Sequence, residues 1–100
     1  MTRSIRTSEP AADEFSAAVR WYEARRRGLG GEFFDAVLAT LSRIETSPGI
    51  GTTISPDGKT RRVLVAKFPY HVVYRFTPTE IVIVAIAHLK RRSGYWNNRS

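Results

Sequence analysis

Two histidines and an arginine-rich C-terminal part are the features of this chain best suited to chemistry. His71 lies in a β-rich run, and an unperturbed histidine has a pKa of about 6.5, so its imidazole could accept or donate a proton near neutral pH. It could equally be a strand residue that makes one hydrogen bond. His88 closes the following run, and we interpret it as structural. The two stand 17 positions apart without an acidic residue at ligand spacing, so no metal or other cofactor is expected.

The absence of cysteine excludes several classes of enzyme. Without a thiol there is no thiolate nucleophile, no cysteine-ligated zinc and no iron–sulfur cluster. The length of 100 residues predicts one modest domain spanning residues 1–100. The longest apolar run, at residues 81–87, is far shorter than the roughly 20 residues of a membrane span, and no apolar signal stretch opens the chain. We therefore expect a cytoplasmic protein that has no membrane partner.

The charge is divided unevenly along the chain. Residues 1–58 carry 7 basic and 8 acidic side chains, whereas residues 59–100 carry 9 basic side chains and only Glu80 as an acid. Arginine dominates the basic set, and its planar guanidinium suits bidentate pairing with phosphate or carboxylate. A surface of one sign attracts partners of the other sign. The C-terminal part thus predicts a surface for a polyanion or an acidic protein, with a merely solvated basic face as the alternative.

An α+β fold of order β-α-α-β-β-β is expected to position these side chains. Residues 2–7 favour a short strand, and Ser8 can cap a helix that ends by Gly28. The glycine-rich segment 28–31 predicts the corner of a helical hairpin, whose second helix covers about residues 32–46. Both helices carry an apolar stripe, which has to cover another layer of the fold.

Three β-rich runs supply that layer, at residues 60–67, 70–77 and 80–88. The turns between them are too short for crossover helices, which predicts antiparallel neighbours. The last run is apolar on both faces, so we expect it to lie centrally in the sheet.

The middle run predicts two different faces. Alternate residues of a strand point to opposite sides, and the aromatic and apolar set, expected to pack on the helices, is Tyr70, Val72, Tyr74 and Phe76. The other side, with His71 and Arg75, is expected to be open to solvent or to a partner. Arg61 and Arg62 alternate in the same way, so at most one of them shares that face.

Several short motifs are spread over nearly the whole chain. They are Ala11-Ala12-Asp13, Trp21-Tyr22, Glu32-Phe33-Phe34, Arg61-Arg62, the run from Lys67 to Arg75, Ala85-Ile86-Ala87-His88, and the run from Arg91 to Trp96. In order and spacing they resemble the RelE/ParE superfamily of small toxins from bacterial type II toxin–antitoxin modules, and the ParE-like plasmid stabilisation branch most. The resemblance implies a helical hairpin on a curved antiparallel sheet. It also implies a hetero-oligomer with a cognate antitoxin, whose acidic, partly disordered tail folds over the toxin.

The resemblance leaves two targets open. ParE-like toxins are associated with poisoning DNA gyrase, whereas RelE-like toxins cut mRNA in the ribosomal A site. The leading prediction is a toxin that acts on gyrase by binding. The residues predicted to contact the target or the antitoxin are Arg61, Arg62, His71, Arg75, Arg91, Arg92, Tyr95 and Trp96. Tyr95 and Trp96 could instead anchor the C-terminal tail through their large apolar areas.

The alternative prediction is a ribosome-dependent mRNA endonuclease. Attack of a 2′-hydroxyl on phosphate needs a proton acceptor, a proton donor and cations. By the resemblance, the residues available for these roles are Arg62, His71, Arg91 and Tyr95. The match is partial, because Leu64 stands where a second lysine belongs and His71 where an arginine belongs. A non-toxic basic binding module or a decayed toxin is the third interpretation.

Overall fold

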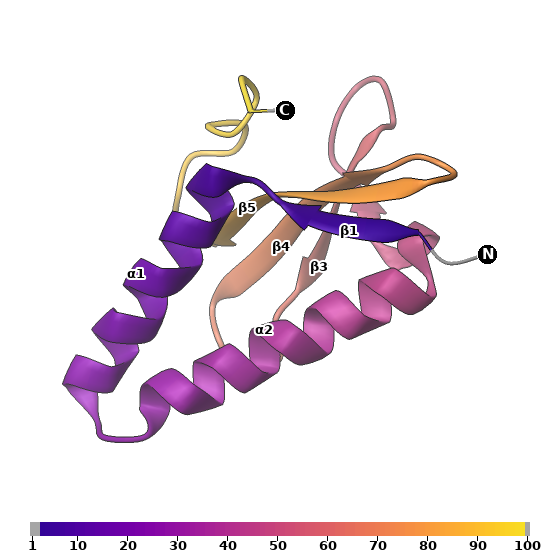
Figure 1. The fold of residues 1–100 in the computed structure, drawn as a ribbon. Coiled ribbons are helices and arrows are strands. Elements are labelled where there is room, and N and C mark those ends of the chain that lie inside the picture. The colour runs from indigo at the N-terminus through magenta and orange to yellow at the C-terminus, as the bar shows by residue number, and fades with distance from the viewer. Residues whose placement is uncertain (1–2, 100) are drawn as a thin grey trace.

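The computed structural model describes residues 3–99, and its elements follow the predicted order (Figure 1). In chain order they are β1 (Ser4–Thr7), α1 (Glu9–Arg25), α2 (Leu29–Thr46), the short 3₁₀ helix η1 (Pro48–Ile50), β2 (Thr52–Thr53), β3 (Thr60–Leu64), β4 (Tyr70–Phe76) and β5 (Glu80–His88). Within the described residues, no helix has both the length and the apolar character needed to cross a membrane.

The strands form one mixed sheet in the order β1-β5-β4-β3-β2. The pairs β3–β4 and β4–β5 are antiparallel, as predicted. The first strand pairs in parallel with β5, so the sheet is not antiparallel throughout. β5 lies inside the sheet, as its unbroken apolar run predicts, although β4 takes the middle position. β2 was not expected, because two threonines form too short a pattern to indicate a strand.

Helix α1 begins where the sequence predicts. The Ser8 hydroxyl oxygen accepts a hydrogen bond from the Ala11 N–H at 3.3 Å, and Pro10 sits in the first turn, where its missing N–H leaves no bond unmade. The same hydroxyl donates to the Val84 carbonyl at 3.2 Å. The cap therefore fixes the start of α1 onto β5 as well.

The corner between the helices spans only residues 26–28. Gly28 has a φ of 89°, in the left-handed region that favours glycine, and α2 begins at Leu29, three residues earlier than predicted. The Glu23 carboxylate accepts hydrogen bonds from the N–H groups of Gly28 and Gly30 at 3.0 Å each, which satisfies donors at the helix start. Gly30 is thus helical, and it lets the helices approach, since a Cβ there would lie 2.7 Å from the Val19 carbonyl oxygen.

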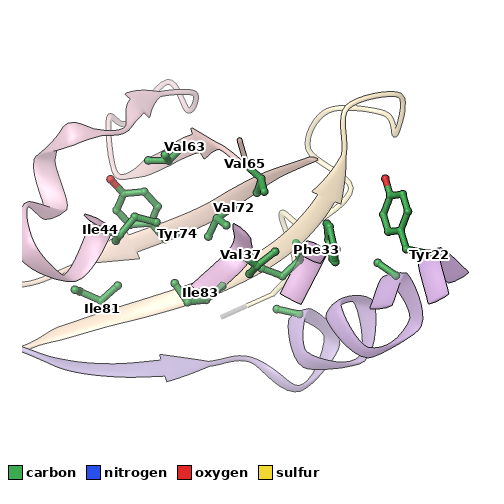
Figure 2. Packing of buried hydrophobic residues seen from close by; sticks show 13 residues of the cluster. Tyr22, Phe33, Val37, Ile44, Val63, Val65, Val72, Tyr74, Ile81 and Ile83 are labelled. Atoms are coloured by element: carbon green, nitrogen blue, oxygen red, sulfur yellow. The ribbon is translucent and has the colours of Figure 1, made fainter. Parts of the chain in front are cut away.

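The main core lies between the helices and one face of the sheet (Figure 2). The predicted aromatic side of β4 faces it, which confirms that prediction: Val72 and Tyr74 are fully buried. Its helical members include Tyr22, Phe33, Val37 and Ile44. The Phe33 ring centroid lies 4.9 Å from that of Tyr70, so the aromatic rings interlock at one end of the core.

The opposite face of the sheet is closed, and the prediction that it is open is wrong. A second cluster covers it, formed by Val73, Val84, Ala85, Ala87 and Trp96. In Figure 1 the helices lie below the sheet and the end of the chain lies above it. Trp96 is buried there because its large apolar ring meets the apolar residues of β5.

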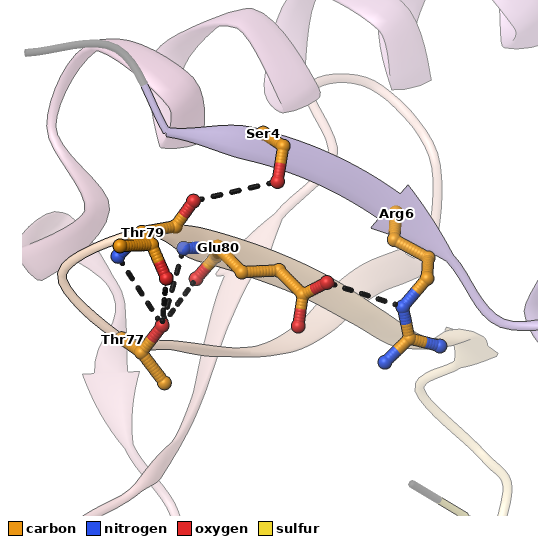
Figure 3. Close-up of polar contacts among 5 residues, drawn as sticks. All are labelled: Ser4, Arg6, Thr77, Thr79 and Glu80. Atoms are coloured by element: carbon orange, nitrogen blue, oxygen red, sulfur yellow. Dashed lines mark hydrogen bonds and ion pairs between the residues drawn. The ribbon is translucent and has the colours of Figure 1, made fainter.

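The turn from β4 to β5 is held by its own hydrogen bonds, and it is also tied to β1, the other neighbour of β5 in the sheet (Figure 3). The Thr77 hydroxyl oxygen accepts hydrogen bonds from the N–H groups of Thr79 and Glu80 at 3.3 and 3.1 Å. The Glu80 carboxylate pairs with Arg6 of β1 at 3.4 Å. The one acid of residues 59–100 is therefore paired at this turn.

Two strands are shorter than predicted. β3 ends at Leu64, because Lys67 takes a φ of 71° and the chain turns back so that the Val65 N–H donates to the Tyr70 carbonyl. β4 ends at Phe76, one residue before the predicted end. The first strand starts at Ser4, and the predicted position 2 lies outside the described residues.

The close approach at Gly30 predicts a stability difference between two neighbouring glycines. Gly30→Ala places a methyl group against the Val19 carbonyl, and we expect a loss of about 1–3 kcal/mol in the free energy of unfolding. Gly31→Ala is the matched control, because the added Cβ meets no heavy atom within 4 Å apart from its chain neighbours and the nearby backbone of its own helix. Alanine is also more favourable than glycine inside a helix, by up to about 1 kcal/mol. Urea unfolding measures both, and equal effects would contradict this account of the hairpin.

Candidate functional site

The C-terminal segment, residues 89–99, folds back as a series of turns. The Leu89 N–H donates to the Pro69 carbonyl at 2.9 Å, which attaches the start of the segment to the loop before β4. Further along, Gly94 has a φ of 84° and accepts from the Asn97 N–H at 3.0 Å. These turns bring Tyr95 and Trp96 back onto the body of the protein. The two aromatic residues therefore anchor the C-terminal segment to the sheet.

Glu14 of α1 holds the segment in place. Its carboxylate accepts three hydrogen bonds, from the Ile86 N–H at 3.0 Å, the Tyr95 hydroxyl at 2.6 Å and the Arg99 guanidinium at 3.0 Å. Only 18% of the Glu14 side chain is exposed. Burial, together with the hydrogen bond to Glu14, raises the pKa of Tyr95 well above its usual value. The Tyr95 hydroxyl therefore stays protonated and acts as a donor.

His71 lies beneath the C-terminal segment. His71 is 5% exposed, and its ring lies at 80° to the Trp96 indole, with the two ring centroids 5.8 Å apart. The Nη1 atom of Arg62 lies 3.5 Å from the His71 Nδ1 atom. Burial, and secondarily the Arg62 charge, lower the pKa of His71, so the imidazole is neutral at pH 7.

Arg61 and Arg75 hold other parts of the backbone. Arg61 faces the helical side, where it donates to the Gly49 and Gly51 carbonyls at 3.2 and 2.8 Å. Arg61 and Arg62 thus lie on opposite faces, as their alternation predicts. Arg75 donates to the Thr60 hydroxyl at 3.0 Å and to the carbonyl of residue 99 at 3.2 Å. Both guanidinium groups are engaged within the protein.

The exposed cations cluster at the start of the C-terminal segment. Lys90, Arg91 and Arg92 are exposed, and the Arg91 guanidinium lies 4.0 Å from the centroid of the Tyr95 ring. Of these three, Arg91 lines a groove of about 340 Å³, which we call the basic groove. The groove is lined by Glu14, Ala17, Ala18, Trp21, Tyr70, Ile86, His88, Arg91 and Tyr95. Trp21 is 52% exposed although it is large and apolar. An exposed tryptophan beside arginine is typical of a binding surface.

The structure arranges the four residues of the nuclease alternative as two separate pairs. Arg62 contacts His71 beneath Trp96, and Arg91 stacks on Tyr95 at the surface. Sequence reasoning missed Glu14 and Arg99, which control the position of Tyr95. The signal was weak, since an acid on an amphipathic helix and an arginine near the chain end are both ordinary on a solvated surface.

A family model and a solved structure both match most of this chain. The family model described as the ParE toxin of the type II toxin–antitoxin system parDE matches residues 5–92. Among solved structures, one titled as the chromosomal ParDE TA system from P. aeruginosa matches with a TM-score of 0.74 at 16% sequence identity, covering 87% of this chain and 96% of that chain. No curated protein matches the sequence. The matched family region ends before Tyr95, Trp96 and Arg99.

Replacing Glu14 with alanine should release the C-terminal segment. Glu14→Ala leaves three donors without their acceptor, so we expect a loss of at least about 2 kcal/mol in unfolding free energy and faster tryptic cleavage after Arg91 and Arg92. Asp13→Ala removes an equal charge from an exposed neighbouring position and should change stability by no more than about 0.5 kcal/mol. Equal cleavage rates in the two variants would show that Glu14 does not hold the segment.

The buried imidazole of His71 predicts a pH dependence of stability. Because its pKa is lowered in the folded state, the unfolded chain takes up a proton first as the pH falls below about 6.5, and the folded state loses stability from there down to the folded pKa. We expect His71→Gln to reduce the drop in unfolding free energy between about pH 7.5 and pH 5.5. His88→Gln removes the other histidine as a control. An unchanged drop in His71→Gln would contradict the linkage.

Proposed function

Because the chain belongs to the ParE toxin family of type II toxin–antitoxin systems, we propose that this toxin poisons DNA gyrase by binding it, and that a cognate antitoxin neutralises the toxin. The observation that carries this proposal is the closure of the C-terminal segment over His71. It leaves cationic and aromatic side chains at the surface and keeps the proton-transfer groups inside.

This closure favours binding over catalysis. A general base has to reach the substrate proton, but His71 is 5% exposed and lies under Trp96. Tyr95 makes a poor base, since its hydroxyl donates to Glu14 and its pKa is raised. Binding has simpler requirements, namely shape, apolar area and charge. The basic groove supplies them through Trp21, Tyr70 and Arg91.

The charge distribution supports an acidic, partly disordered antitoxin tail as the neutralising partner. Residues 59–100 hold 9 basic side chains, and their one acid, Glu80, pairs with Arg6 of the other half. A disordered acidic segment can cover such a surface by folding as it binds. We therefore propose a hetero-oligomer with the antitoxin, in the cytoplasm, where gyrase acts.

A supercoiling assay with purified gyrase tests the proposal. The toxin should inhibit supercoiling and trap a cleavage complex. Removing both arginines in Arg91→Ala/Arg92→Ala should raise the half-inhibitory concentration by at least about tenfold, because arginines beside exposed aromatics carry much of a binding energy. The control Arg26→Ala/Arg27→Ala makes the same charge change at the hairpin corner and should inhibit as the wild type does. Lack of inhibition by the wild-type toxin would refute gyrase as its target.

Two further assays identify the alternatives. Toeprinting of translating ribosomes would reveal cuts in A-site codons, and their loss in His71→Ala would establish the mRNA endonuclease instead. Expression of the toxin without an antitoxin would leave growth unchanged for a non-toxic binding module or a decayed toxin.

A further inference from the structure

Two arginines are stacked on aromatic rings at the basic groove. The Arg25 guanidinium lies 4.2 Å from the centroid of the Trp21 ring. The Arg91 guanidinium lies 4.0 Å from the centroid of the Tyr95 ring, and both aromatic residues line the groove. Neither arginine belongs to the three ion pairs formed among residues 3–99. Within that part of the chain their charges are therefore not paired with an acid, and they attract an anionic ligand.

The acid in the lining does not oppose such a ligand. Glu14 pairs with Arg99 at 3.0 Å, and its carboxylate oxygens accept the three internal hydrogen bonds described above. Its negative charge is thus compensated within the protein. Lys90 and Arg92, on either side of Arg91 in the sequence, are exposed. Positive charge therefore dominates at this end of the groove.

Trp21 offers a planar apolar surface to the groove. The small side chains of Ala17 and Ala18 lie one turn earlier on α1 and line the groove with it, so space remains beside the indole. Trp21 is 52% exposed even though Arg25 is stacked on it. An exposed indole beside arginines favours a ligand with a planar ring that can stack on it, and a nucleobase has such a ring.

His88 adds a hydrogen-bond donor to the groove. The Lys90 N–H donates to the His88 Nδ1 atom at 3.0 Å. A neutral imidazole that accepts at Nδ1 carries its proton on Nε2. The His88 ring lies at 75° to that of Tyr70, with centroids 5.1 Å apart, and both residues line the groove. The groove thereby combines a stacking surface, cations and a donor, which together suit a base and its phosphates.

We propose that the basic groove binds single-stranded DNA, with one base stacked on Trp21 and the adjoining phosphates on Arg25 and Arg91. The inference rests on the proposed function and deepens it, because it names the DNA held by gyrase as a ligand of the toxin. The volume of about 340 Å³ is at the lower end of the range for small-ligand sites, which suits one nucleotide. The His88 Nε2–H would then donate to the base or to a phosphate oxygen.

Single-stranded DNA fits these groups better than duplex DNA or an acidic peptide does. The bases of a duplex are stacked on one another, so they are not available to Trp21. An acidic peptide would satisfy Arg25 and Arg91, but its carboxylates would leave the indole surface unused. In a trapped cleavage complex the DNA is broken, and a base beside a break is easier to unstack than one inside an intact duplex.

Fluorescence anisotropy with the full-length toxin tests the inference without gyrase. The probe is a labelled oligodeoxyuridylate of about 12 nucleotides, within the usual range of single-stranded sites. We expect Trp21→Ala to weaken its binding at least about fivefold, because a stacked base is lost, whereas Trp21→Phe keeps a ring and should lose less. Phe34→Ala is the matched control, since it removes an aromatic ring that is 43% exposed on α2 outside the groove lining, and it should bind as the wild type does. Thermal unfolding checks that each variant is folded.

The salt dependence of binding tests the phosphate contacts. For a single strand, the logarithm of the binding constant falls with the logarithm of the salt concentration with a slope of about −0.7 per phosphate neutralised. Arg91→Ala should therefore make the slope shallower by about 0.7. Arg27→Ala removes the same charge from an exposed residue at the hairpin corner and should leave the slope unchanged. Equal slopes in the two variants would overturn the role assigned to Arg91.

Three competing ligands identify other occupants of the groove. They are the same strand hybridised with its complement, an oligouridylate RNA of the same length, and a polyglutamate chain of similar charge. Trp21→Ala should leave duplex binding unchanged, and an equal loss on duplex and single strand would overturn base stacking. Binding of the RNA or of polyglutamate at least about tenfold more tightly than the DNA strand would identify RNA or an acidic protein as the occupant and would overturn the inference.

The supercoiling assay separates this inference from the proposed function. Inhibition of gyrase by a toxin that does not bind the oligonucleotide would overturn the DNA site and leave gyrase poisoning standing. Oligonucleotide binding that depends on Trp21, by a toxin that does not inhibit gyrase, would support the DNA site and refute gyrase as the target. Absence of both activities would overturn both proposals.

Discussion

The Glu14 carboxylate is the interaction on which the arrangement of the functional surface depends. A carboxylate that is mostly buried is stable only when donors compensate for its lost hydration. Here the donors come from β5 and from two points of the C-terminal segment, Tyr95 and Arg99. The carboxylate thereby joins α1, the sheet and the end of the chain. Trp96 fills the space that this junction encloses, and the face bearing His71 becomes a second core.

Because the C-terminal segment covers that face, the predicted site residues fall into two groups, those that are engaged inside the protein and those that are exposed. His71, Trp96, Arg75 and Arg61 make internal contacts and contribute to stability. The exposed cations Lys90, Arg91 and Arg92 lie at the start of the C-terminal segment, where Arg91 lines the basic groove. A toxin that works by binding needs no exposed acid–base pair. A face closed by apolar packing is therefore compatible with activity, whereas a nuclease would have to open it.

Local patterns predicted most of the fold but little of the site. The Ser8 cap, the two faces of β4 and the alternation of Arg61 and Arg62 follow from spacing within a few residues. The contact between Glu14 and Tyr95 joins positions 81 apart, and no local pattern indicates it. The parallel pairing of β1 with β5 is equally non-local. Gly30 was misjudged because glycine usually interrupts helices, whereas here close contact with α1 requires it.

The size of the toxin determines how long an antitoxin segment has to be to cross its surface. The protein measures 40 Å in its longest dimension. An extended chain covers about 3.3–3.6 Å per residue, so roughly 12 residues span any path of that length. A tail of about that length that covers Arg91 and Arg92 would block the surface proposed for gyrase.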